Sequence, residues 1–272
     1  MSAIALLALD VDGTLVGPEG SVSPRRRRAL NACLARGLHV CLVTGRPLLA
    51  ALPLARALGL RTPPAVFGGS LVPDLDGGAP WYSRPLARDV LPALIDEARA
   101  HDDYLEIHTA DQLYVERDGP ESGYQTDKLR VAPLIGPFAA LPPGEPILKA
   151  QFVLRTAQQD ERIRALGERL RGRVELAWNV SPGFDGHFVN INAPGVHKVA
   201  ALEAILARLG LGWGQVLAAG DSPGDLPMVQ RASIGLLMGS ATADLRAQVR
   251  WVMPTVEEDG LAQGIERFVL DG

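Results

Sequence analysis

Three apolar segments in this chain each run directly into a loop of polar residues. The segments 4–9, 39–43 and 215–219 are apolar almost throughout. Apolar runs that are continuous rather than alternating predict strands buried on both faces, as in a parallel sheet covered by helices. In sheets of this kind, ligands bind at the carboxyl ends of the strands. The polar residues that follow the three segments are therefore the first candidates for a functional site.

The order of the expected helices and strands indicates an α/β fold that is interrupted once. Strand and helix alternate up to about residue 80, and the alternation returns after Gly195. Between these points the order is helix, strand, strand, twice over, which is typical of an α+β domain with an antiparallel sheet. We predict a Rossmann-like parallel-sheet core of residues 1–83 and 188–272 with an inserted α+β domain of residues 84–187.

The individual elements follow from the apolar periodicity and from the Gly and Pro positions that end each run. Besides the three buried strands, we expect helices over 25–36, 48–58, 87–100, 158–170, 198–209, 226–231 and 261–270, and strands near 65–67, 104–108, 112–116, 147–154, 174–178, 188–192 and 234–238. The arginine run 25–28 falls in the first turn of its helix, where cations are poorly placed against the helix dipole. We interpret this run as a solvated face.

Composition excludes several classes of protein. The chain has 272 residues, of which 47% are hydrophobic, enough for a full core. Its 27 basic and 31 acidic residues give a net charge of −4, which argues against a nucleic-acid partner. No apolar run has the length of a membrane span, and a cleaved signal peptide would remove Asp10. We expect a cytoplasmic protein, with Cys33 and Cys41 as core residues in a reducing compartment.

The first polar loop supplies a pair of carboxylates. Asp10 and Asp12 are separated by one residue at the end of the first segment, so both can face the same crevice. One carboxylate could attack phosphorus, while the other protonates the leaving alcohol and later activates water. Gly13 permits the tight turn, and its exposed backbone could hold phosphoryl oxygens. An isolated Asp-x-Asp is more often an ordinary turn, so the other loops decide between the two interpretations.

The other two loops and one helix supply the groups that such chemistry needs. Asp221 and Asp225 follow the third segment, and with Asp10 they could bind Mg²⁺, a hard cation that prefers oxygen ligands. Lys198 could bring a positive charge to the phosphoryl group, and the Thr44 hydroxyl could donate to another of its oxygens. Each of these residues alone is ordinary. Their joint occurrence at strand ends favours phosphoryl-transfer chemistry.

These motifs resemble those of the haloacid dehalogenase superfamily. The matching residues are Asp10-Val11-Asp12-Gly13-Thr14-Leu15, Val43-Thr44-Gly45-Arg46, Lys198 and Gly220-Asp221-Ser222-Pro223-Gly224-Asp225, in the order of the four superfamily motifs. The resemblance covers nearly the whole chain. The long insertion, Gly195-Val196-His197-Lys198 and Glu258-Asp259-Gly260 resemble the Cof-like branch of phosphatases, which has a large α+β (type C2) cap. The inserted domain would then be a cap that selects the substrate.

The resemblance also implies roles for single residues. Asp10 would be the nucleophile that forms a phosphoaspartate, Asp12 the general acid and base, and Thr44 and Lys198 the groups that stabilise the phosphate. Asp10, the backbone carbonyl of Asp12, Asp221 and Asp225 would form the metal site, with Asp225 positioning a metal-bound water or Lys198. Gly13, Gly45 and Arg46 are the expected substrate-binding residues. The superfamily usually has Asn at the position of Gly224, which would weaken the surroundings of the metal or the loop.

We therefore expect a Mg²⁺-dependent phosphatase acting on a small phosphorylated metabolite, a sugar phosphate first, as a monomer or homodimer without nucleic-acid or membrane partners. A phosphosugar mutase could use the same two aspartates, and a non-catalytic metabolite-binding regulatory protein could keep the same scaffold. Asp12 disfavours a dehalogenase, because those relatives lack the second aspartate. Hexose phosphates, pyridoxal phosphate and flavin mononucleotide all remain open as substrates. The further candidates for selecting among them are Arg46, His187, Asn190, Asn192 and His197.

Overall fold

The computed structural model describes residues 3–180 and 184–271 and divides the chain into two compact units. The first unit comprises residues 1–46, 51–83 and 197–272. The second comprises residues 47–50 and 84–196. Each unit has its own sheet and its own hydrophobic core, so each is described by itself.

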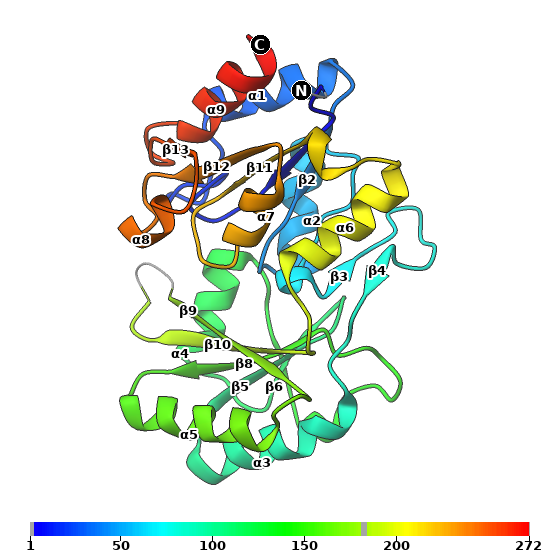
Figure 1. Ribbon diagram of the computed structural model, residues 1–272. Helices are drawn as coiled ribbons and strands as arrows, with labels where there is room; N and C mark the ends of the chain where they lie inside the picture. Colours follow the sequence, from blue (N-terminus) through cyan, green and yellow to red (C-terminus); the bar gives the residue numbers. More distant parts are fainter. Residues whose placement is uncertain (1–2, 181–183, 272) are drawn as a thin grey trace. The chain divides into compact units, whose positions relative to one another are not determined.

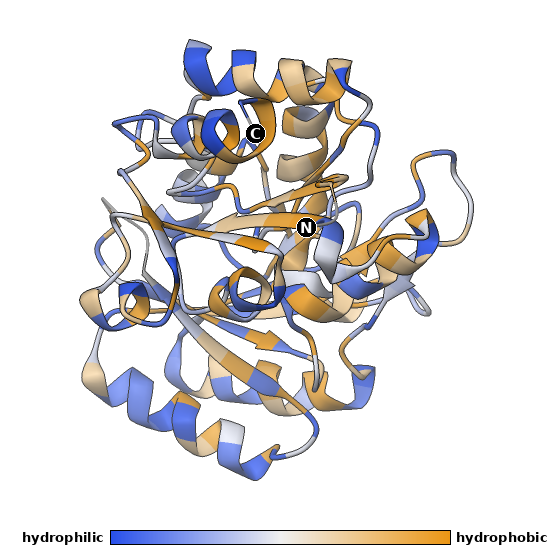
Figure 2. Cartoon of the chain, turned by 45° about the horizontal axis from the view of Figure 1, so that its top comes forward, coloured by the Kyte–Doolittle hydropathy of each residue, from blue (hydrophilic) through white to orange (hydrophobic). Residues whose placement is uncertain are grey.

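The sheet of the first unit consists of parallel strands (Figure 1). Its order is β13-β12-β11-β1-β2, with β1 at Leu6–Leu9, β2 at His39–Leu42, β11 at Val216–Gly220, β12 at Ile234–Met238 and β13 at Trp251–Met253. All four residues of β1 and all five of β11 are buried, and Figure 2 shows the hydrophobic colouring of this sheet. The predicted buried parallel sheet is confirmed.

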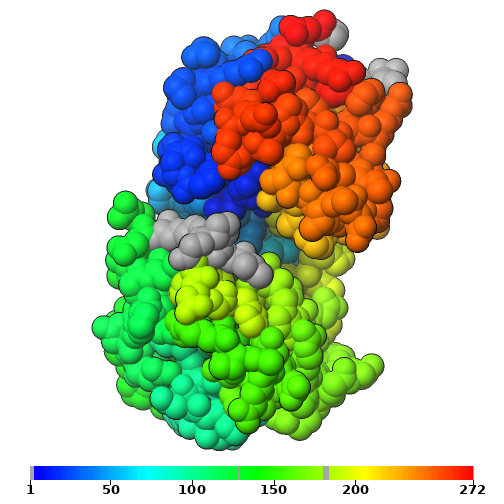
Figure 3. All heavy atoms as spheres, turned by 90° about the vertical axis from the view of Figure 1, so that its left-hand side faces the viewer, coloured from blue at the N-terminus to red at the C-terminus, as the bar shows by residue number. Residues whose placement is uncertain are grey.

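Helices cover both faces of this sheet. α1 (Pro24–Ala35) and α9 (Gly260–Ile265) pack in one apolar cluster with Leu7 and Leu9 of β1. α6 (Lys198–Leu209) and α7 (Leu226–Arg231) pack with the alternate residues Leu6 and Ala8. The other helices are α2 (Leu48–Ala57), whose first three residues belong to the second unit, and α8 (Ala243–Arg246). Because α9 packs on α1, the C-terminal segment lies against the N-terminal one, as Figure 3 shows in red and blue.

The arginine run of α1 is not wholly solvated, which corrects the sequence-based interpretation. Arg26 is 3% exposed, and its guanidinium donates to the carbonyl of Leu15 at 2.6 Å and to the carboxylate of Asp259 at 3.1 Å. Arg25 pairs with Glu266. Arg27 donates to the carbonyl of Ala57 at 3.0 Å. Residues distant in the sequence therefore hold three of the four arginines. Such partners cannot be read from the local sequence.

The second unit contains a six-stranded sheet of order β7-β6-β5-β8-β10-β9. The strands are β5 (Tyr104–His108), β6 (Leu113–Val115), β7 (Leu134–Ile135), β8 (Lys149–Leu154), β9 (Glu175–Val180) and β10 (His187–Asn192). All neighbours are antiparallel except β6 and β7. Helices α3 (Leu91–His101) and α5 (Ala157–Arg169) cover one face of this sheet through a shared apolar core.

The predicted boundary at residue 188 is wrong. β10 pairs with β8 and with β9, so residues 188–196 lie in the second unit, which extends to Val196. A strand has the same local pattern in either unit, and only its pairing partners assign it. The change at the other boundary falls between Ser83 and Arg84.

Most of the expected elements are present with small shifts at their ends. The expected strand at 65–67 is reduced to two isolated bridges, one between Val43 and Ala65 and one between Val66 and Leu71. Phe67 ends it, because this residue begins a 3-10 turn, Phe67–Gly69, with a φ of 53°. Two short strands, β3 (Leu71–Val72) and β4 (Tyr82–Ser83), form a hairpin that the sequence analysis did not predict. The last helix ends as a π-helix over Glu266–Leu270. A further short helix, α4 (Pro120–Tyr124), lies in the Pro/Gly-rich stretch.

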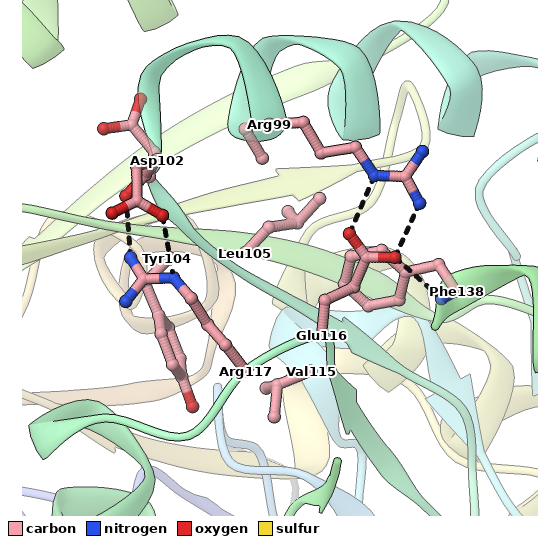
Figure 4. Close-up of a pocket in the computed structure, with 10 residues that line it drawn as sticks. Arg99, Asp102, Tyr104, Leu105, Val115, Glu116, Arg117 and Phe138 are labelled. Atoms are coloured by element: carbon pink, nitrogen blue, oxygen red, sulfur yellow. Dashed lines mark hydrogen bonds and ion pairs between the residues drawn. The ribbon is translucent and has the colours of Figure 1, made fainter. Parts of the chain in front are cut away.

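A small pocket in the second unit is lined by residues that form ion pairs with one another (Figure 4). Arg99 donates to both carboxylate oxygens of Glu116, at 2.9 and 2.6 Å, and Arg117 pairs with Asp102 at 3.3 Å. The charged groups that line this pocket therefore satisfy one another and are poor candidates for binding a ligand. Cys33 and Cys41 are buried free thiols, as expected of core residues. Among the described residues, no helix combines the length and the apolar character needed to cross a bilayer.

Candidate active site

The polar loops after β1, β2 and β11 lie side by side because these strands are neighbours in the sheet. In the register of the sheet, Leu9 of β1 is level with Leu42 of β2 and with Ala219 of β11. Asp10 directly follows β1, Asp221 directly follows β11, and Thr44 lies two residues beyond β2. Parallel pairing thus brings three distant parts of the sequence to one edge of the sheet.

Lys198 lies between two of the carboxylates. Its ammonium donates to Asp10 Oδ1 at 2.5 Å and to Asp225 Oδ1 at 2.6 Å. Lys198 is the first residue of α6, whose N-terminus is capped by His197: the His197 Nδ1 accepts from the backbone N–H of Ala200 at 3.0 Å. Burial by itself lowers the pKa of Lys198, but the charges of Asp10 and Asp225 outweigh burial and raise it, so the ammonium stays protonated.

A turn that the sequence analysis missed joins Lys198 to the loop after β2. The backbone N–H of Phe67 donates to the carbonyl of Arg46 at 2.9 Å, and that of Gly68 donates to Thr44 at 3.0 Å. A Cβ on Gly69 would lie 2.5 Å from the carbonyl oxygen of His197, so only glycine lets this turn reach the start of α6. The dipeptide Gly68-Gly69 directly after an expected strand was the available signal for this turn.

Asp225 organises the loop after β11. Its Oδ2 accepts from the backbone N–H groups of Asp221 and Ser222, at 3.2 and 3.0 Å, and from the Ser222 hydroxyl at 2.6 Å. Its other oxygen binds Lys198, and the side chain is fully buried. A Cβ on Gly220 would lie 2.2 Å from the Cβ of Asp225, so glycine is required there. Ser222 is a second residue whose role the sequence analysis missed.

Asp12 forms a separate pair with Arg46. The guanidinium donates through Nε to Asp12 Oδ2 at 2.8 Å and through Nη2 to Oδ1 at 2.7 Å. A bidentate contact of this kind fixes the orientation of the carboxylate. Arg46 also donates its backbone N–H to the hydroxyl of Thr44 at 3.1 Å. Asp12 is half exposed while Arg46 is largely buried, so the carboxylate can be reached from solvent.

Three carboxylates form a cluster that suits a hard divalent cation. Ligand oxygens of Asp10, Asp221 and Asp225 all lie within 4.8 Å of one another. Burial raises the pKa of Asp10 well above its ordinary value, and burial together with the charge of Asp225 raises the pKa of Asp221 to about 7. A cation beside these groups would favour their ionised forms. A Cβ on Gly13 would lie 2.2 Å from Asp221 Oδ2, and its φ of 78° independently favours glycine.

The predicted site residues thus fall into two groups. Asp10, Lys198, Asp221 and Asp225 are connected through one ammonium and one carboxylate cluster. Asp12, Thr44 and Arg46 form the second group, in which the Asp12 side chain contacts Arg46. Among the described residues, the acidic cluster consists of Asp10, Asp221 and Asp225, and the metal contact expected through the backbone of Asp12 stays a prediction.

The further candidates for substrate selection lie elsewhere. His187, on β10, approaches Asp160 of α5 at 2.6 Å, and Asn190 and Asn192 lie on the same strand. His197 is the cap of α6, a structural role. These contacts do not by themselves assign any of the four residues to a ligand.

A sequence model of the haloacid dehalogenase-like hydrolases matches residues 7–265 of the chain. The chain belongs to this family. The family match spans both units, so it includes the carboxylate cluster after β1 and β11 as well as the inserted second unit. The resemblance inferred from the four motifs is confirmed, and so is the α/β fold with a second, sheet-containing domain.

Two bacterial phosphatases are similar to this chain over most of its length. A 5-amino-6-(5-phospho-D-ribitylamino)uracil phosphatase of Bacillus subtilis is 28% identical over 269 residues, covering 98% of this chain and 96% of its own. The HMP-PP phosphatase of Serratia proteamaculans is 29% identical over 264 residues, covering 89% and 86%. These relatives are phosphatases, which bears out the assignment of the chain to the phosphoric monoester hydrolases.

Solved structures of this family have the same fold. A haloacid dehalogenase-like hydrolase from Bacteroides thetaiotaomicron superposes with a TM-score of 0.87 at 24% identity, covering 97% of this chain and 99% of its own. The sugar phosphatase BT4131 of subclass IIB superposes with a TM-score of 0.80 at 21% identity, covering 97% and 98%. At these identities the likeness establishes the fold and leaves the substrate open.

Proposed function

We propose that this protein is a Mg²⁺-dependent phosphatase that hydrolyses a small phosphorylated metabolite, a sugar phosphate, through a phosphoaspartate on Asp10. The observation that carries the proposal is the position of Lys198 between Asp10 and Asp225, beside Asp221. A nucleophilic carboxylate, a fixed ammonium and a set of oxygen ligands are the groups that phosphoryl transfer from a monoester requires.

In the first step, a carboxylate oxygen of Asp10 attacks phosphorus and the bond from phosphorus to the leaving oxygen breaks. Asp12 gives a proton to that oxygen, which departs as an alcohol. In the second step, Asp12 takes a proton from a water molecule, whose oxygen attacks the phosphoaspartate. The acyl phosphate bond then breaks, which releases inorganic phosphate and restores Asp10.

Asp12 and Arg46 must separate in part during this cycle. Their bidentate contact engages both oxygens of Asp12, while the leaving oxygen needs one of them. A phosphate group is an equally good partner for a guanidinium. An arriving phosphoryl group can therefore draw Arg46 away from Asp12, which is consistent with the expected role of Arg46 in binding substrate. The Thr44 hydroxyl and the backbone at Gly13 and Gly45 would complete the phosphate site.

Asp10 and Asp221 are the side chains suited to hold Mg²⁺, together with the backbone carbonyl of Asp12. Both oxygens of Asp225 already accept hydrogen bonds, so this residue is better suited to positioning Lys198 and the loop. When bound, Mg²⁺ supplies positive charge that stabilises the phosphoryl oxygens during transfer. The second unit would act as the cap that selects the substrate.

Measuring phosphate release from sugar phosphates, nucleotides and cofactor phosphates tests the proposal, with Asp10→Asn as the control. Release that requires Mg²⁺ and disappears both with EDTA and in Asp10→Asn would support it. Acid-quenched protein should carry one phosphate on an acid-stable, base-labile bond, found at Asp10 by mass spectrometry. Hydrolysis without such an adduct would refute the covalent route, and no hydrolysis of any ester would refute the phosphatase.

A further inference from the structure

The sheet of the second unit has one apolar and one polar face. Successive residues of a strand point to opposite faces, and Ile107, Phe152 and Val189 belong to the apolar core shared with α3 and α5. On the other face, Tyr104, Val153 and Phe188 form a separate apolar cluster. The other six residues on this face are polar, although they lie in the central strands β5, β8 and β10. These are Glu106, His108, Lys149, Gln151, Asn190 and Asn192, which we call the polar face.

The strand register places these side chains in two adjacent rows. Glu106 pairs with Gln151, and Gln151 pairs with Asn190. In the next row, His108 pairs with Lys149. Pairs in register point to the same side of a sheet and lie within reach of one another. The rows thus form one continuous polar surface across three strands.

Burying the side chains of the polar face costs free energy of folding. Glu106 is 0% exposed, Lys149 5% and Asn192 8%. Taking such groups out of water is unfavourable unless hydrogen bonds replace the lost ones, and the central strands of buried sheets are otherwise apolar. A purely structural sheet would place apolar residues here, as it does on the opposite face.

The Glu106 carboxylate is fully hydrogen-bonded. The carboxylate accepts from Gln125 at 2.9 and 3.1 Å and from Gln151 at 2.8 Å, and it lies 3.1 Å from His108 Nε2. Gln151 is oriented by this contact, and its amide oxygen accepts from the Lys149 ammonium at 2.8 Å. Glu106 therefore positions Lys149 through Gln151.

Near Lys149, by contrast, hydrogen-bonding groups lack partners within the described part of the chain. An ammonium has three hydrogens to donate, and among the described residues the Lys149 ammonium has one hydrogen-bond acceptor, Gln151. The buried amide oxygens of Asn190 and Asn192 have no hydrogen-bond partner in the described part of the chain. Burial lowers the pKa of Lys149 to about 8, so it still carries its charge at neutral pH. Donors and acceptors thus remain available on one surface, and a hydroxyl group, which both donates and accepts, satisfies either.

Exposure increases toward the edge strand β9. Glu106 is buried, Asn190 is half buried, and Ala177 and Glu175 of β9, which pair with β10, are exposed. At the other end of the face, the rings of Tyr124, Phe184 and Phe188 pack on one another with centroids 4.7 to 5.4 Å apart. A ligand would therefore reach the polar end from the β9 side, and the aromatic rings are engaged with each other.

We propose that the polar face recognises the polyhydroxylated part of the substrate, with Lys149 and Asn192 as its principal contacts, so that the enzyme selects sugar and polyol phosphates over aromatic ones. This inference rests on the proposed function, because that function supplies the phosphate ester whose organic part needs recognition. Glu106 and Gln151 are positioning residues, since they act through Lys149.

Kinetics with two classes of ester test the assignment. We would compare wild type, Lys149→Met and Asn192→Leu on glucose 6-phosphate, ribitol 5-phosphate and p-nitrophenyl phosphate, which has no hydroxyl groups. The ratio of kcat/KM for the polyol phosphates to that for p-nitrophenyl phosphate should fall about tenfold or more in both variants, mainly through KM. Asn31→Leu, the same change as Asn192→Leu but on the exposed surface of α1, should leave this ratio unaltered.

The outcomes separate recognition from folding. Lys149→Met keeps the length of the side chain and removes a buried charge, so a recognition role leaves the melting temperature equal or higher. If Lys149 had only a structural role, Lys149→Met would lower the melting temperature and would reduce kcat/KM equally for both classes of ester. That result would overturn the inference. An unchanged ratio would also overturn it while leaving the phosphatase intact.

A binding measurement tests the inference even if the protein hydrolyses none of the esters. If wild type hydrolyses no ester at all, the proposed function is wrong, and calorimetric titration with ribitol 5-phosphate still tests the polar face. Affinity about tenfold weaker in Lys149→Met than in wild type would support recognition. Equal affinity, or no binding to wild type, would overturn it.

Discussion

The two sheets of this protein carry their polar residues in different places. In the first unit β1 and β11 are apolar throughout and β2 is apolar after His39, and polar residues follow the ends of these strands. In the second unit, polar residues lie within the strands β5, β8 and β10 and occupy much of one face, beside an apolar cluster that includes Tyr104, Val153 and Phe188. The parallel sheet is covered by helices on both faces, whereas α3 and α5 cover one face of the antiparallel sheet. The proposed chemistry of the first unit therefore depends on loops, and the proposed recognition by the second unit depends on a strand surface.

Removing the nucleophile should give the largest effect. We expect Asp10→Asn to reduce phosphate release by on the order of 10⁴-fold or more, since the covalent step is lost. Without metal its melting temperature should equal or exceed that of wild type, because burial raises the pKa of Asp10 and makes its charge unfavourable. Phosphate release and calorimetric scans in EDTA measure the two quantities. A strand-end residue that proved essential for stability would weaken the contrast between the two sheets.

Truncating the apolar face of the second sheet should affect stability rather than chemistry. Phe152 is completely buried in the core that includes α3 and α5, so Phe152→Ala should cost about 3–5 kcal/mol of unfolding free energy. Urea titration measures this cost. Gln158→Ala, on the exposed surface of α5, is the control and should change stability by less than about 0.5 kcal/mol. A cost for Phe152→Ala no larger than for Lys149→Met would contradict the assignment of the two faces.

The acidic cluster should make the metal-free protein less stable as pH rises. The pKa of Asp221 is about 7 in the folded protein, above its ordinary value of 3.8, because of burial and the charge of Asp225. The folded state thus holds this proton more tightly than the unfolded chain does. The associated stability is fully present below about pH 4 and is lost as pH rises through about 7.

Asp221→Asn removes that dependence. In EDTA, the free energy of unfolding of wild type should fall by up to about 4 kcal/mol relative to that of Asp221→Asn between pH 4 and pH 8. Urea titrations at each pH measure this difference. Adding Mg²⁺ should stabilise wild type and have little effect on Asp221→Asn. Parallel pH curves for the two proteins would contradict the raised pKa, and equal responses to Mg²⁺ would place the metal elsewhere.

The smallest effect is expected from a substitution at Gly224, the position at which the superfamily usually has Asn. The nearest atom to a Cβ placed on Gly224 is Ser222 Oγ at 3.7 Å, an ordinary contact. Gly224→Asn should therefore be accommodated, with kcat/KM within about threefold of wild type and stability within about 0.5 kcal/mol. Kinetics and urea titration would show this. A large gain in Mg²⁺ affinity would mean instead that the missing amide matters to the metal site.

Local sequence predicted much of this arrangement. The continuous apolar runs predicted β1, β2 and β11 as buried parallel strands, and the helix expected over 198–209 is α6 as observed. The motifs selected Asp10, Lys198, Asp221 and Asp225, which the structure brings together. These predictions succeed because strand burial and helix capping depend on residues close in sequence. The cytoplasmic location and the oligomeric state stay predictions.

By itself, the sequence determined the fold class, the strand ends that carry polar groups and the family. Tertiary structure alone decided that β10 belongs to the second sheet, that Arg26 is buried against Asp259, and that Lys149 and Asn192 lie on one polar face. Each of these depends on which distant segment becomes a neighbour. A strand or a charged side chain has the same local pattern whichever partner it finds, so only pairing and packing across the chain select among the alternatives.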